Sequence, residues 1–139
     1  MRQLILALVL GLSMKAAMAA PSIYVFVSFS MPEQLLTETL RDAATLHIPA
    51  ILNGLIDNSM PKTVQKIMAL SNKVPNLNLQ IDPTAFERFE IKQVPALVVA
   101  NLHAFDVLYG NGSLFDALLR IAGQGESGLT RLDVQELSA

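Results

Sequence analysis

The sequence predicts an α/β fold in which a mixed central sheet carries helices on both faces. Residues 23–29 (IYVFVSF) are uncharged and rich in β-branched and aromatic side chains, a pattern typical of a central strand. An amphipathic helical pattern follows up to about residue 46, and such a strand–helix–strand start pairs its strands in parallel through a right-handed crossover. Further on, apolar segments at 96–100 and 105–109 are separated only by a turn, so we expect an antiparallel hairpin.

The remaining elements follow from hydrophobic periodicity and turn residues. Val64, Ile67 and Met68 lie at helical spacing, whereas the segment LNLQI alternates and predicts a strand with one buried side. Phe86 and Phe89 give a short helix an apolar side that we expect in the core. The expected elements are a strand at 50–52, a helix at 60–72, a strand at 77–81, a short helix from 83 and a last helix at 114–122.

Polar residues mark the helix starts. Ser30 and Glu33 have the spacing of a capping box, and Asp82 before Pro83 is a helix-start signal. A second interpretation stays open for each: Ser30 and Glu33 as the remnant of an active-site turn that now contacts a partner, and Asp82 as a catalytic carboxylate. The two histidines stand alone, without a second histidine or a carboxylate at ligand spacing, so no metal site is predicted.

The N-terminal segment predicts export. Residues 1–3 are basic, residues 4–12 are an apolar run, and Ala17-Met18-Ala19 fits the small-x-small rule for cleavage. We therefore expect a signal peptide at 1–19 that is cut after Ala19, with an uncleaved anchor as the alternative. The run is far shorter than the ~20 residues that span a bilayer, so no stable membrane insertion is expected after cleavage.

The rest of the 139-residue chain divides into a domain and a tail. We expect one folded domain at 20–123, after which the composition becomes polar and rich in glycine. Residues 124–139 predict a flexible C-terminal tail, because chain ends are usually loose unless something ties them down. The leucines and the valine of this segment leave open a second interpretation, an amphipathic segment that docks on the domain.

Charge and cysteine content exclude several classes of function. Cleavage after Ala19 removes Arg2 and Lys15, which leaves 8 basic against 12 acidic residues. This acidic balance argues against a nucleic-acid partner, which needs a basic face. The sequence has no cysteine, which excludes disulfides, dithiol redox chemistry and zinc sites with cysteine ligands. No cofactor is expected.

The order of elements, with a proline opening the strand before the final hairpin, resembles the thioredoxin fold. Val94-Pro95 stands at the position of the cis-proline of that fold, so the resemblance implies a cis bond at Pro95. The turn Ser30-Met31-Pro32-Glu33 stands where redox members carry Cys-x-x-Cys, with Ser30 and Glu33 at the cysteine positions. The resemblance implies a thioredoxin-like fold without the redox activity, and no enzymatic function is expected.

Four motifs carry a closer resemblance, to the TrbC family of F-type conjugative pilus assembly proteins. They are residues 26–32 (FVSFSMP), 53–59 (NGLIDNS), 81–86 (IDPTAF) and 93–96 (QVPA). The resemblance implies a periplasmic, non-enzymatic component of a type IV secretion system that moves DNA between bacteria. It also implies contacts with other pilus assembly proteins, among which a TraW-like protein is the natural candidate.

The groove beside a cis-proline in such a fold can bind an extended peptide through main-chain hydrogen bonds. The residues expected at this partner-binding groove are Phe29, Ser30, Met31, Pro32, Gln93, Val94 and Pro95. A second candidate is a binding loop that contains Asn53, Gly54, Asp57 and Asn58. This loop is equally explained as a turn followed by a helix cap, and both interpretations stay open.

Two functions from different classes fit these observations. The first is a periplasmic assembly factor of a conjugative pilus that acts through protein–protein contacts. The alternative is a redox-inactive envelope chaperone of thioredoxin fold that binds extended or unfolded polypeptides.

Overall fold

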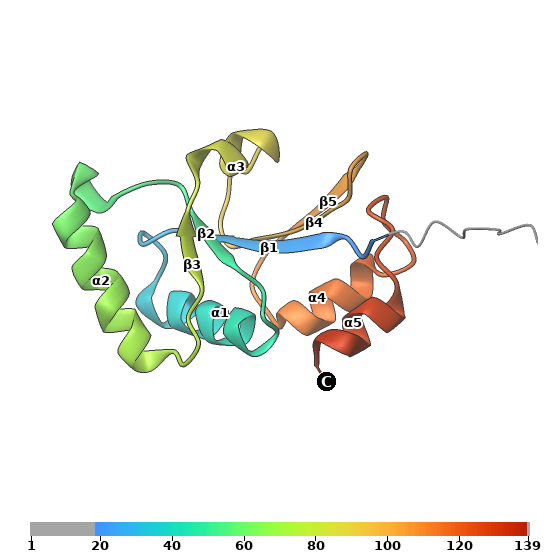
Figure 1. Ribbon diagram of the computed structural model, residues 1–139, viewed down its shortest axis with the longest axis horizontal. Coiled ribbons are helices and arrows are strands. Elements are labelled where there is room, and N and C mark those ends of the chain that lie inside the picture. The colour runs from blue at the N-terminus through green and yellow to red at the C-terminus, as the bar shows by residue number, and fades with distance from the viewer. Residues whose placement is uncertain (1–18, 139) are drawn as a thin grey trace, which may run out of the picture.

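The computed structural model describes residues 19–138, so the predicted signal peptide lies outside the described residues except for its last residue. Five strands form one sheet in the order β3-β2-β1-β4-β5 (Figure 1). The strands are β1 (Ser22–Val27), β2 (Ala50–Leu52), β3 (Leu79–Ile81), β4 (Ala96–Ala100) and β5 (Phe105–Tyr109). The helices are α1 (Glu33–Thr45), α2 (Met60–Lys73), α3 (Pro83–Arg88), α4 (Leu114–Ile121) and α5 (Arg131–Leu137), with a 3-10 turn η1 (Ile56–Asn58). No helix in this part of the chain is long and apolar enough to cross a membrane.

The sheet is mixed, as predicted. Strand β1 pairs in parallel with β2 and antiparallel with β4, and Phe26 lies opposite Ile51 on one side and Ala96 on the other. Strand β3 extends the parallel part beyond β2, and β5 closes the predicted hairpin with β4. This arrangement is consistent with the thioredoxin-like α/β fold that the resemblance implied.

Helices cover both faces of the sheet (Figure 1). Helices α1, α4 and α5 lie on one face and α3 lies on the other. Helix α2 lies beside α1 at the β3 end, where Lys66 Nζ donates a hydrogen bond of 2.7 Å to the Glu33 carboxylate. Helix α2 fully buries only Thr63 and Leu70, so much of its apolar side stays exposed.

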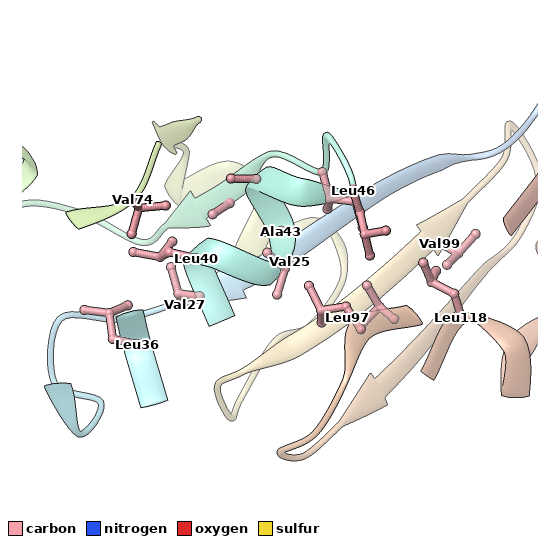
Figure 2. Close-up of a cluster of buried hydrophobic side chains, with 14 of the residues drawn as sticks. Val25, Val27, Leu36, Leu40, Ala43, Leu46, Val74, Leu97, Val99 and Leu118 are labelled. Atoms are coloured by element: carbon pink, nitrogen blue, oxygen red, sulfur yellow. The ribbon is translucent and has the colours of Figure 1, made fainter. Parts of the chain in front are cut away.

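The larger core fills the space between the sheet and α1. Figure 2 shows Leu36, Leu40 and Ala43 of α1 gathered over Val25 and Val27 of β1. All five side chains are buried. Because full burial of a leucine or valine side chain contributes ~1.5–3 kcal/mol, this contact is a main source of stability.

A smaller aromatic core lies on the other face. Phe26 of β1 meets Phe86 of α3 edge to face, with ring centroids 4.8 Å apart and planes at 84°. Phe89, directly after α3, also contacts Phe26 and is buried, as predicted for both phenylalanines. The predicted cap of α3 is confirmed, because Asp82 Oδ1 accepts a hydrogen bond of 3.1 Å from the backbone N–H of Ala85.

The predicted capping box of Ser30 and Glu33 is wrong. Helix α1 begins at Glu33, and no side chain caps it. Proline disfavours the helical conformation in the residue before it, so Pro32 keeps Met31 out of the helix and moves the start beyond the capping distance of Ser30. Glu33 pairs with Lys66 instead, and the hydrogen bond from this ammonium group lowers the pKa of Glu33.

The expected flexible tail at 124–139 is also wrong for the residues that the structure describes. Helix α5 begins with a capping box in which the Thr130 hydroxyl accepts from the Asp133 N–H and the Asp133 carboxylate accepts from the Thr130 N–H. Leu129 and Val134 are buried in the larger core. The docked amphipathic segment, which was the second interpretation, describes this part of the chain.

Asp106 in β5 holds the loop that leads to α5. Its two carboxylate oxygens accept hydrogen bonds of 2.9 Å from the N–H groups of Glu126 and Ser127. Partial burial raises the pKa of Asp106, but hydrogen bonding by Ser127 and Glu126 outweighs it and leaves the pKa below its usual range. We ascribe the lowering chiefly to the backbone donors, because the buried Ser127 Oγ has no hydrogen-bond partner among the described residues. A Cβ at Gly125 would clash with the Asp106 carboxylate, so the contact also depends on glycine at that position.

The aromatic core gives a first prediction. Phe86→Ala should lower the free energy of unfolding by ~3–5 kcal/mol, because it removes a buried ring and leaves a cavity under Phe26. Leu102→Ala is a suitable control, since the Leu102 side chain is 96% exposed and its loss should change stability by less than ~0.5 kcal/mol. Denaturant unfolding measures both variants, and equal midpoints for Phe86→Ala and the wild type would show that this ring is not part of the core.

A second prediction concerns Asp106. Asp106→Asn should cost about 1–3 kcal/mol at neutral pH, because it weakens hydrogen bonds to a charged acceptor. The folded-state pKa lies below the unfolded value of ~3.9, so the wild-type advantage is complete above that value and disappears as the pH falls through the folded pKa. Unfolding measured from neutral to acidic pH should therefore show the wild type and the variant converging in acid.

A double-mutant cycle isolates this contact. Gly125→Ala should destabilise the wild type more than it destabilises an Asp106→Ala variant, in which the clashing carboxylate is gone. Equal costs in the two backgrounds would show that the carboxylate does not hold the loop.

Candidate functional site

A pocket of about 540 Å³ opens where the parallel strands β1 and β2 end, and we call it the strand-end pocket. Ligands of open α/β sheets commonly bind outside the carboxyl ends of the strands. One wall is the turn between β1 and α1, and the other is the loop between β2 and η1. The lining residues are Ser28, Phe29, Ser30, Leu52, Asn53, Gly54, Leu55, Ile56 and Asp57.

The turn between β1 and α1 is shaped by local hydrogen bonds. The hydroxyl groups of Ser28 and Ser30 lie 2.8 Å apart, and Ser28 Oγ also accepts from the N–H of Ser30. The N–H of Met31 bonds to the Ser28 carbonyl, and Met31 Sδ accepts from the N–H of Ser28 at 3.4 Å. These contacts leave the Ser30 side chain exposed at the pocket and turn Met31 inward.

The opposite wall is fixed by a threonine that sequence reasoning missed. The fully buried Thr63 Oγ1 accepts from the N–H of Ile56 at 2.9 Å and donates to the Ser59 carbonyl at 2.7 Å. Asp57 and Asn58 have positive φ angles of 47° and 54°, a conformation that these two residue types tolerate better than most. In the sequence, the feature that could have indicated this role of Thr63 was a single threonine beside the apolar positions at the start of α2.

The structure brings together only part of the predicted groove. Phe29 and Ser30 line the strand-end pocket with Asn53, Gly54 and Asp57 of the predicted loop. The remaining predicted residues, Met31, Pro32, Gln93, Val94, Pro95 and Asn58, are not among the lining residues.

Met31 and the proline loop lie elsewhere. The expectation that Met31 faces a partner is wrong, because its side chain is buried in the larger core and only 7% exposed. The Val94–Pro95 bond is cis. Val94 packs against both cores, and Pro95 is buried beside a narrow cavity of about 30 Å³ that also touches Leu97 and Leu108.

The chemistry of the strand-end pocket suits recognition. The hydroxyl of Ser30 has another hydroxyl as its neighbour, and a serine needs an adjacent base to act as a nucleophile. Asp57 carries the charge of the lining, and an exposed ion pair of 3.1 Å joins it to Lys62. Among residues 19–138, no group of three histidine, aspartate or glutamate side chains is placed to hold a metal ion.

Comparison with known proteins covers both walls of this pocket. The model of the type-F conjugative transfer system pilin assembly protein family matches residues 25–121, from β1 to the end of α4. The chain is also 37% identical over 101 residues to the periplasmic protein TrbC of Escherichia coli (strain K12). That match covers 73% of this chain and 48% of the relative, so the chain spans about half the length of the relative. No solved structure matches the chain. By the family match over most of its length, the chain belongs to the type-F conjugative transfer system pilin assembly proteins.

Proposed function

We propose that this protein is a periplasmic assembly factor of a conjugative pilus and that it acts by binding other proteins, without catalysis. The family match over residues 25–121 carries the proposal. It includes β2 to β5, the second half of β1 and the strand-end pocket, so the family resemblance includes the surface that would make the contacts.

Two observations support the periplasmic location. The first 19 residues have the composition of a signal peptide, and the E. coli relative is named as a periplasmic protein.

The two carboxyl groups with shifted pKa values among the described residues are not tuned for acid–base catalysis. A general acid or base works best with a pKa near the operating pH, which for a carboxyl group requires a raised pKa. Glu33 and Asp106 have lowered pKa values, and structural partners explain both shifts. Ser30, at the position of a redox cysteine, lies in a turn that local hydrogen bonds already satisfy.

The strand-end pocket is the contact surface that we propose for an extended segment of a partner, with a TraW-like protein as the first candidate. Both walls are held by hydrogen bonds of the chain itself, which lowers the entropic cost of binding. Phe29, Leu55 and Ile56 offer half-buried apolar surface, and the hydrogen-bonded hydroxyls of Ser28 and Ser30 stand beside it, with Ser30 exposed at the rim.

Deleting the gene from its conjugative element should abolish both pili and DNA transfer, and a plasmid copy should restore them. Transfer frequency and electron microscopy of pili measure the outcome. Normal piliation of the deletion strain would contradict the proposed function.

A variant that fills the pocket tests the contact surface. A Cβ at Gly54 meets no atom within 4 Å, so the backbone leaves room for a side chain here, and Gly54→Phe is designed to place a ring at the pocket. We expect thermal stability to hold while the affinity for the partner falls by at least tenfold, which corresponds to about 1.4 kcal/mol of lost binding free energy, and the transfer frequency should fall as well. Ala69→Phe adds the same bulk to the exposed surface of α2 and should leave transfer unchanged. Wild-type transfer by Gly54→Phe would show that the partner binds elsewhere.

The chaperone alternative gives a different result in vitro. Suppression of aggregation of unrelated unfolded proteins would favour a chaperone, and selective capture of one component of the transfer machine would favour the assembly factor.

A further inference from the structure

A larger pocket, of about 710 Å³, lies on the α3 face beside the turn between β4 and β5. We call it the hairpin pocket. Its walls come from the start of β1, the end of α3 and the hairpin itself. Its volume lies within the range of ~300–1,000 Å³ that is typical of ligand pockets. The lining residues are Ala19, Ala20, Pro21, Ser22, Tyr24, Arg88, Phe89, Ala100, Asn101, Leu102, His103, Ala104 and Phe105.

Three aromatic rings form the apolar part of this pocket. The Phe89 ring contacts Tyr24, with centroids 6.2 Å apart, and meets Phe105 edge to face at 5.1 Å. Phe89 is buried, whereas 41% of Phe105 is exposed. Phe105 therefore presents an apolar surface to solvent and packs on the buried ring of Phe89.

The turn between β4 and β5 exposes a leucine side chain to solvent. Asn101 Oδ1 accepts hydrogen bonds of 2.7 Å from the N–H groups of His103 and Ala104, and the N–H of Asn101 bonds to the Ala104 carbonyl. The Asn101 side chain also donates to the Ser127 carbonyl at 2.8 Å, which ties the turn to the loop before α5. Leu102, at the tip, is 96% exposed. The polar groups of the turn are therefore used in hydrogen bonds within the protein, while its apolar leucine side chain faces solvent.

The guanidinium group of Arg88 lies at the rim of the hairpin pocket. The Arg88 guanidinium sits 5.7 Å from the centroid of the Phe89 ring. It makes none of the ion pairs found within residues 19–138, which all involve lysines. Arg88 is the permanently charged side chain among the described lining residues. A guanidinium that rests on a ring keeps its N–H donors available for a carboxylate.

We propose that the hairpin pocket binds an extended segment of a partner protein in which an acidic residue adjoins aromatic or aliphatic side chains. The apolar side chains lie against Tyr24, Phe89 and Phe105 under Leu102, and the carboxylate pairs with Arg88. An apolar floor with one cation at its rim is complementary to that pattern in both shape and charge. This surface is separate from the strand-end pocket, and the inference does not rest on the pilus role.

Two synthetic peptides test the charge. The probes are acetyl-Gly-Phe-Asp-Leu-Gly-amide and the same peptide with asparagine in place of aspartate, titrated into the isotopically labelled protein and followed by its backbone amide NMR signals. We expect shifts that cluster at Ala100, Phe105 and the segment around Phe89. The acidic peptide should bind about twofold to fivefold more tightly, as expected of one exposed ion pair.

Surface variants separate the two parts of the site. Arg88→Gln should reduce the preference for the acidic peptide and leave the affinity for the neutral peptide unchanged. Leu102→Ser should weaken both peptides by about tenfold, because a leucine side chain loses its apolar contact. Met68→Ser is the matched control, since Met68 is an apolar residue of α2 that is 62% exposed, outside the pocket lining, and its loss should change neither affinity.

Other occupants give distinct outcomes. The proposal would be overturned if no shifts appeared around the hairpin pocket at millimolar peptide. It would also be overturned if the wild type and Arg88→Gln each bound the two peptides with equal affinity. Shifts at the same residues with dodecanoate and none with either peptide would also overturn it, in favour of a lipid ligand. So would a wild-type dimer in sedimentation that Leu102→Ser dissociates, because the surface would then join two copies of this chain.

Discussion

The complete burial of the second half of β1, from Val25 to Val27, is the constraint on which the rest of the structure depends. Val25 and Val27 lie under α1 and Phe26 lies under α3, and none of the three has any exposed surface. Backbone groups of a strand so placed must be paired on both sides, and β2 and β4 supply the pairs. The two helix layers, the mixed sheet and the pocket at the end of β1 all follow from covering this strand.

Those features that reside in short stretches of sequence could be predicted. The run around Phe26 indicated a central strand, and Asp82 before a proline indicated a capped helix, because each pattern acts through its own neighbours. The start of α1 was mispredicted because Ser30 satisfied the spacing rule for a cap while Pro32 set a later start. The docking of α5 was not visible in the same way, since it depends on the contact between Asp106 and a loop distant in sequence.

The candidate site shows the same division between local and distant effects. The turn at Ser30 and the loop at Asn53 were predicted as separate surfaces, and the parallel pairing of β1 with β2 makes them the two walls of one pocket. Pro95 was grouped with them by resemblance, yet it is buried at the start of β4 beside a different cavity. The hairpin pocket had no motif of its own, because its rings come from β1, β5 and the residue after α3, which only the folded sheet brings together.

The antiparallel pairing of Ser22 with Ala100 has a consequence for how the chain folds. One neighbour of the central strand, β2, follows it closely in the sequence, whereas the other, β4, comes only after α3, and the helix that buries Val134 lies later still. Contacts so distant in sequence slow the closure of a sheet, because the long loop between them must be ordered before they form. The sheet therefore closes only when the segment up to β4 is present, because an N-terminal part that stops before β4 lacks one of the two neighbours of the central strand.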